Sequence, residues 1–187
     1  ILKSIDAGAD IIMLPMFKTM YEVESFFKFT SNKVKTTLLF ETAESICLLS
    51  EVCKIKELNE IYVGLNDMHL SLNMSFLFEP LVYGIVDLFS KYSQEYNKSF
   101  GFGGLATLEG GVIAGKHILT EHARLNSKSV ILSRAFFGAE ENILSNLKSE
   151  VSKIKELYNN YQKECDEHFY IKNRNFLKDS IKRIVNK

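Results

Sequence analysis

The chain has 187 residues, of which 23 are lysine or arginine and 23 are aspartate or glutamate. This length suits one well-packed domain, and the balanced charge provides no positive field of the kind that attracts nucleic acid. The three cysteines Cys47, Cys53 and Cys165 lack Cys-x-x-Cys spacing, which argues against a disulfide framework or a thiolate zinc site. No apolar run approaches the roughly 20 residues of a membrane-spanning helix. We therefore expect a cytoplasmic protein without nucleic-acid or membrane partners.

The chain opens on Ile1 rather than methionine. Residues 1–5 have the pattern of the middle of an amphipathic helix. We therefore expect the sequence to be a fragment of a longer protein.

Short apolar runs alternate with helical patterns along the first two thirds of the chain. The expected strands are Ile11–Leu14, Thr36–Phe40, Ile61–Leu65, Phe100–Phe102 and Val130–Leu132. The expected helices are Glu22–Phe29, Ala43–Cys53, one that Pro80 opens and that runs to Phe89, and Val112–Leu125. This alternation predicts an α/β fold with right-handed crossovers and a parallel sheet that is covered on both faces.

The pattern changes after Phe136, where no further strand is predicted. Glu140–Gln162 is a long charged amphipathic segment, and a basic helix is expected over Asn175–Val185. We predict a sheet-containing part at residues 1–138. A helical extension at residues 139–187 is expected to pack on it or on a partner subunit.

Two acidic residues follow predicted strands: Glu41 follows the run ending at Phe40, and Asp67 follows the run from Ile61 to Asn66. The carboxyl ends of parallel strands meet at one edge, so both carboxylates can converge on one hard divalent cation, Mg²⁺ or Mn²⁺. With Glu41 and Asp67, two oxygens of a 2-oxo acid and two waters would give the ion six ligands. The ion would then stabilise an enolate formed from that acid. Alternatively, Glu41 interacts with a helix dipole beside a Thr42 cap.

Other polar residues have competing interpretations. The glycines of Gly101–Gly104 could cradle a phosphate, or they could permit tight turns and close packing. Glu121 and His122 lie inside a helical pattern, which favours structural hydrogen bonds or an interface over acid–base chemistry. His69, two residues after Asp67, is expected on a loop, either solvated or near a substrate.

Several segments resemble the HpcH/HpaI aldolase and citrate lyase family. Three of them are similar, in order, to consecutive strand-end motifs of that family: Gly8–Met16, Phe40–Ala43 and Tyr62–Met68. Three more are similar to a subgroup found in surface-polysaccharide gene clusters: Phe100–Leu105, Glu121–Leu125 and Val130–Phe136. The family resemblance covers about residues 1–138.

The resemblance implies a (β/α)8 TIM barrel, of which this chain would hold strands four to eight and C-terminal helices. It implies a homo-oligomeric lyase of the aldolase type that acts on a pyruvate-type 2-oxo acid and an aldehyde. In this interpretation Glu41 and Asp67 bind Mg²⁺ or Mn²⁺. The family's histidine-centred base and carboxylate-clamping arginine would lie upstream of Ile1, so the fragment alone is expected to be inactive.

The resemblance also implies a substrate-binding set. The backbone at Asn66 and Asp67 would bind the substrate carboxylate, with Gly64 and Pro15 beside it. Arg134 could reach an anionic substrate tail or make a structural ion pair. The family commonly has small residues or proline at the positions of Leu65 and Asn66. The resemblance therefore does not define the shape of the pocket or the identity of the substrate.

Two other functions fit the same sequence. One is a lyase for malyl-CoA or citramalyl-CoA thioesters, which would require a coenzyme A groove with a basic rim. The other is a non-catalytic barrel remnant that serves as an assembly component, whose unpaired strand edges would pair with another polypeptide.

Overall fold

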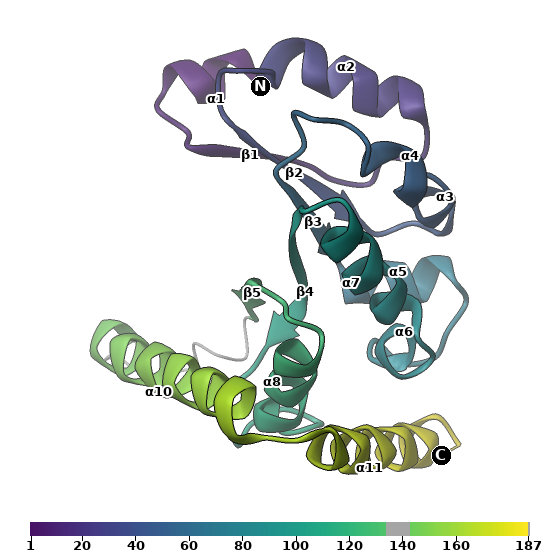
Figure 1. The fold of residues 1–187 in the computed structure, drawn as a ribbon, viewed down its shortest axis with the longest axis vertical. Helices are drawn as coiled ribbons and strands as arrows, with labels where there is room; N and C mark the ends of the chain where they lie inside the picture. Colours follow the sequence, from purple (N-terminus) through teal and green to yellow (C-terminus); the bar gives the residue numbers. More distant parts are fainter. Residues whose placement is uncertain (134–142, 187) are drawn as a thin grey trace. The chain divides into compact units, whose positions relative to one another are not determined.

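Five strands form one sheet in the order β1-β2-β3-β4-β5. The computed structural model describes residues 1–133 and 143–186 (Figure 1). The strands are β1 (Ile11–Leu14), β2 (Lys35–Phe40), β3 (Glu60–Val63), β4 (Ser99–Leu105) and β5 (Ser129–Leu132). The pairs β1–β2, β2–β3 and β3–β4 are parallel, with Leu38 opposite Ile61 and Ile61 opposite Phe100. The predicted α/β fold with a parallel sheet is confirmed.

One helix precedes the first strand, and others connect the strands or follow the last one. They are α1 (Leu2–Asp6), α2 (Met20–Thr30), α3 (Ala43–Cys47), α4 (Leu49–Val52), α5 (Leu65–Ser71), α6 (Glu79–Val82), α7 (Ile85–Glu95), α8 (Gly115–Arg124), α10 (Ile143–Glu164) and α11 (Glu167–Val185). The chain divides into two compact units, residues 1–102 and 103–187, each of which is described by itself. No helix in the described ranges combines the length and apolar character that crossing a bilayer requires.

Several expected boundaries differ from those of the structure: α8 begins at Gly115 and not at Val112, β4 extends to Leu105, and α11 begins at Glu167 and not at Asn175. Three further differences change the elements themselves. The strand expected to end at Leu65 ends at Val63, because Leu65 already begins α5. The helix expected from Pro80 is two helices, since Gly84 between them has φ +88°, a left-handed conformation that ends a helical run. The helix expected at Ala43–Cys53 is divided at Leu48. The start of the segment expected at Glu140–Gln162 lies outside the described residues.

Aromatic packing fixes the interior of the first unit. The rings of Phe17 and Phe40 meet edge to face at 4.9 Å between centroids, and those of Phe40 and Phe89 at 4.8 Å. All three side chains are fully buried. Because Phe40 is the last residue of β2, this cluster fixes the end of that strand, where Glu41 follows.

The capping box of α2 gives a stability prediction. The Thr19 side chain accepts a hydrogen bond from the Glu22 N–H, and the Glu22 carboxylate accepts one from the Thr19 N–H at 2.9 Å. We expect Thr19→Ala to lower the free energy of unfolding by about 1 kcal/mol, measured by urea denaturation. Thr19→Ser should retain most of the stability, and equal losses in both variants would contradict the capping role.

In the second unit, α10 and α11 pack on α8. Leu177 and Ile181 of α11 and Ile154 of α10 are buried. The Asp166 side chain accepts a hydrogen bond from the Phe169 N–H at 2.9 Å and so caps the start of α11. The two long helices therefore bury an apolar face within this unit.

Candidate functional site

The ends of β1, β2 and β3 are joined by hydrogen bonds in the first unit. The Gly64 N–H donates to the Phe40 carbonyl at 2.9 Å, one residue beyond the regular β2–β3 pairing. The Thr42 hydroxyl donates to the Phe17 carbonyl at 3.0 Å. Thr42 also caps α3, as predicted. These contacts hold the segments after the three strands at one edge of the sheet.

The structure brings Glu41 and Asp67 together at this edge. Both side chains are partly exposed. Burial raises the pKa of Glu41, the neighbouring negative charge of Asp67 raises it further, and the backbone N–H of Met16 opposes both effects. Asp67 does not lie on a loop after a strand, as expected, but is the third residue of α5. The first turn of that helix is what turns its carboxylate toward Glu41.

Gly64 positions the Glu41 side chain. A Cβ atom on Gly64 would lie 2.7 Å from Glu41 Cγ and 2.8 Å from Oε1, closer than side chains pack. The φ of Gly64 is −83°, which any residue can adopt, so the requirement for glycine comes from this contact and not from backbone conformation. The sequence pointed to Gly64 as a pocket residue, whereas the structure places it directly against Glu41.

Met16 has an unusual backbone conformation beside the same carboxylate. Its φ is +53°, in the left-handed region that non-glycine residues seldom occupy. Its N–H lies close enough to Glu41 to lower the pKa of that carboxyl. Sequence reasoning missed this residue, because the conformation depends on contacts that the pattern around Pro15 does not reveal.

The remaining predicted substrate-binding residues are only partly placed. Pro15 is exposed and directly follows β1, next to Met16. Asn66 is exposed and is the second residue of α5. Arg134 lies outside the described residues. The described site therefore consists of two carboxylates and the short backbone segments around them.

This donor set fits a hard divalent cation. Within residues 1–133 and 143–186, no group of three or more histidine, cysteine or acidic side chains gathers, so Glu41 and Asp67 are a two-carboxylate site. Mg²⁺ is commonly bound through one or two carboxylates, with water and substrate oxygens at the other positions. A cation between the two groups would also offset the repulsion that raises the pKa of Glu41.

His69 does not belong to this site. It is buried within α5, with its Nδ1 atom 3.3 Å from the Leu65 carbonyl. It is therefore not a solvated loop residue, and that expectation was wrong. The spacing of Leu65, Met68 and His69, which are the buried residues of α5, was the helical signal that could have corrected it.

The polar residues of α8 are structural. The Glu121 side chain is fully buried and accepts hydrogen bonds from Arg124 Nε at 2.8 Å and from Arg174 at 3.3 Å. The Asn173 side-chain amide donates a hydrogen bond to the other carboxylate oxygen of Glu121 at 3.2 Å. This network joins α8 to α11, which confirms structural hydrogen bonding for Glu121.

The glycines of Gly101–Gly104, for which phosphate binding was the weaker alternative, lie inside β4 and not in a loop after a strand. A Cβ on Gly104 would lie 3.5 Å from the Ser133 Cβ, an ordinary packing distance. Burial raises the pKa of the Cys53 thiol to about 11, which keeps it protonated and unreactive.

No protein-family model matches the chain, and no curated protein sequence matches it. Several solved structures do match. The citrate synthase SbnG is 17% identical, with a TM-score of 0.59, over 83% of this chain and 66% of its own. An HpcH/HpaI aldolase/citrate lyase family protein from Burkholderia cenocepacia is 12% identical, with a TM-score of 0.59, over 83% and 67%. A citrate lyase beta subunit from M. tuberculosis, complexed with oxaloacetate and magnesium, is 11% identical, with a TM-score of 0.59, over 81% and 62%.

The chain thus spans about two thirds of the length of the solved structures that it matches. At these identities the likeness concerns the fold alone. The proposed subgroup of surface-polysaccharide gene clusters finds no support in these matches and stays a prediction. The fold is an α/β arrangement with five parallel strands, consistent with part of a (β/α)8 barrel like that of the HpcH/HpaI aldolases.

Proposed function

We propose that the protein is a divalent-metal-dependent carbon–carbon lyase of the aldolase type that acts on a pyruvate-type 2-oxo acid. The observation that carries this proposal is the pairing of Glu41 with Asp67 at the ends of parallel strands. The fold adds support, because solved structures with it include an aldolase family protein and a citrate lyase subunit bound to oxaloacetate and magnesium.

Glu41 and Asp67 would hold Mg²⁺ or Mn²⁺. When bound, the ion supplies positive charge that stabilises an enolate oxygen as the carbon–carbon bond breaks. Gly64, which carries no side chain, leaves room for the Glu41 carboxylate beside the backbone. The N–H groups of Asn66 and Asp67 belong to the first turn of α5, where helical N–H groups have no partner within the helix. We propose that these two N–H groups donate hydrogen bonds to the substrate carboxylate.

The remaining parts of the proposal concern the intact protein. We assign Arg134 to an anionic substrate tail and Pro15 to the pocket rim, with an aldehyde as the second product. The general base and the carboxylate-clamping arginine are assigned to the part of the barrel that this chain does not hold. We further propose that the intact protein is a cytoplasmic homo-oligomer.

Proton exchange at pyruvate C3 tests the proposal directly. The intact protein is incubated with pyruvate in deuterated buffer, with Mn²⁺ or with EDTA, and the deuterium content of the pyruvate is followed by mass spectrometry. We expect exchange only with Mn²⁺, because enolate formation needs the positive charge. Exchange at background under both conditions would reject the enolate chemistry and favour a non-catalytic role.

A matched pair of variants ties the exchange to the site. Glu41→Gln should lose it, since the amide lacks the negative charge that binds the ion. Glu44→Gln, at an exposed glutamate in the first turn of α3, should retain it. Equal exchange in both variants would separate the activity from this carboxylate pair.

A further inference from the structure

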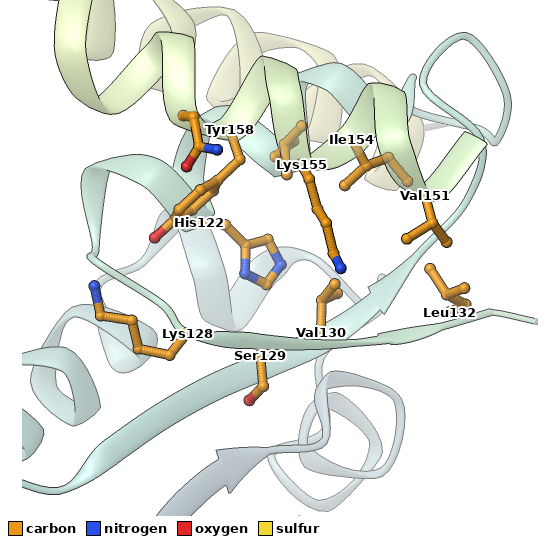
Figure 2. Close-up of a pocket in the computed structure, with 11 residues that line it drawn as sticks. His122, Lys128, Ser129, Val130, Leu132, Val151, Ile154, Lys155 and Tyr158 are labelled. Atoms are coloured by element: carbon orange, nitrogen blue, oxygen red, sulfur yellow. The ribbon is translucent and has the colours of Figure 1, made fainter. Parts of the chain in front are cut away.

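A pocket lies entirely within the second unit, and none of the residues that line it belongs to the carboxylate site. It has a volume of about 540 Å³, is open to solvent on one side and is lined by residues of α8, α10 and the segment that contains β5 (Figure 2). Its apolar wall consists of Leu119, Val130, Leu132, Val151 and Ile154. Cavities that bind small organic ligands have this size and this predominantly apolar lining.

The charged groups of the cavity all have one sign. Lys128 and Lys155 line it, and no acidic residue does. Figure 2 shows the Lys155 side chain reaching down from α10 between Val151 and His122, with its amine over β5. Within the described ranges Lys155 makes no ion pair and no hydrogen bond, whereas Lys128 donates to Asn126 at 2.5 Å. Lys155 is exposed to solvent, and its amine at the edge of the apolar wall has no anionic partner among the described residues.

The floor of the cavity is fixed and uncharged. Burial lowers the pKa of His122 to about 3, so its ring is neutral at physiological pH. The Ser127 hydroxyl donates to the Ser129 carbonyl at 3.2 Å, so the His122 ring donates to Ser127 through Nδ1 at 2.8 Å. The Tyr158 hydroxyl donates to the Ser127 carbonyl at 2.7 Å. These bonds hold the floor against α10. Among the described residues of the lining, Lys128 and Lys155 are the cations.

We propose that this cavity binds a small carboxylate with an apolar chain. The chain lies along the apolar wall between Val130 and Val151, and the carboxylate contacts the Lys155 amine. The apolar wall would bind the hydrocarbon part of the ligand, since contact with the wall removes apolar ligand surface from water. The amine accounts for the charge, since a lysine beside a carboxylate makes a charge-assisted hydrogen bond. The inference does not depend on the proposed lyase activity, because it uses no residue of the carboxylate site.

Titration calorimetry of the intact protein with decanoate and with decanol tests both parts of the proposal. We expect decanoate to bind more tightly than decanol. Lys155→Met should weaken decanoate by about fivefold and leave decanol unchanged, because one partly exposed charge pair is lost. Lys163→Met, at an exposed lysine of the same helix that does not line the cavity, should change neither affinity.

A filling variant checks that the ligand enters the cavity. Val151 is a partly exposed residue of α10 that lines the pocket, so Val151→Phe places a ring in this space. The variant should abolish binding of both compounds while α10 stays helical by circular dichroism. The proposal is overturned if decanoate does not bind, if decanol binds equally well, or if decanoate affinity survives both Lys155→Met and Val151→Phe.

Discussion

Replacing Gly64 with alanine is expected to weaken Mn²⁺ binding by about 10–100-fold, the range for residues that orient metal ligands. The added Cβ would lie 2.7 Å from Glu41 Cγ and 2.8 Å from Oε1, so the Glu41 side chain must leave its position. The Gly64 backbone itself is not strained by the change, because its φ is −83°. Calorimetric titration with Mn²⁺ measures the loss, and pyruvate exchange should fall with it.

Gly104→Ala is the matched control. Gly104 lies within β4, and a Cβ there would meet Ser133 Cβ at an ordinary 3.5 Å. Mn²⁺ affinity should not change in this variant. The melting temperature without metal reports separately on whether Gly64→Ala remains folded. A folded Gly64→Ala protein with the affinity of the unaltered chain would show that Glu41 does not bind the ion.

The strand pattern and the carboxylate pair could be predicted from sequence because both are local signals. A run such as Leu38–Phe40 is apolar and bounded by polar residues, which is what a buried parallel strand requires. Glu41 directly follows that run, and the parallel pairing of β2 with β3 brings the residues after both strands to one edge. This inference uses only the order of strands in the chain. It therefore predicted the correct edge of the sheet for Asp67, even though the strand before Asp67 was predicted two residues too long.

What the sequence did not reveal depends on contacts between distant residues. Met16 has a φ of +53°, and its N–H lies beside Glu41. Neither feature leaves a signal in the sequence pattern. The close approach of Gly64 to the same side chain likewise joins residues 23 positions apart, 64 minus 41. His69 was misplaced for a different reason: a two-residue shift of the strand end decided between a loop and a buried helical position.

The second large effect is expected from Glu41→Gln, which should make the metal-free protein more stable at neutral pH. Burial and the Asp67 charge raise the pKa of Glu41 above its ordinary value of 4.5, so the native state holds this proton more tightly than the unfolded state. Stability must then fall as the pH rises from about 4.5 through the raised pKa, because the unfolded state binds fewer protons in that window. The neutral amide removes this loss, so the free energy of unfolding in EDTA should exceed that of the unaltered protein at pH 7.

Mn²⁺ should reverse the order of the two proteins. At a free concentration about 100 times the dissociation constant, a ligand of the native state adds about 2.7 kcal/mol to the free energy of unfolding. The unaltered protein should gain this amount and Glu41→Gln should not, as measured by urea denaturation with Mn²⁺ and with EDTA. Glu44→Gln is the control, because hydrogen bonds to its own N–H and to Lys18 lower the pKa of Glu44. It should show no gain in EDTA and a full response to Mn²⁺. A Glu41→Gln protein that is less stable in EDTA, or that Mn²⁺ stabilises fully, would mean that the carboxylate is held for structure and not for a cation.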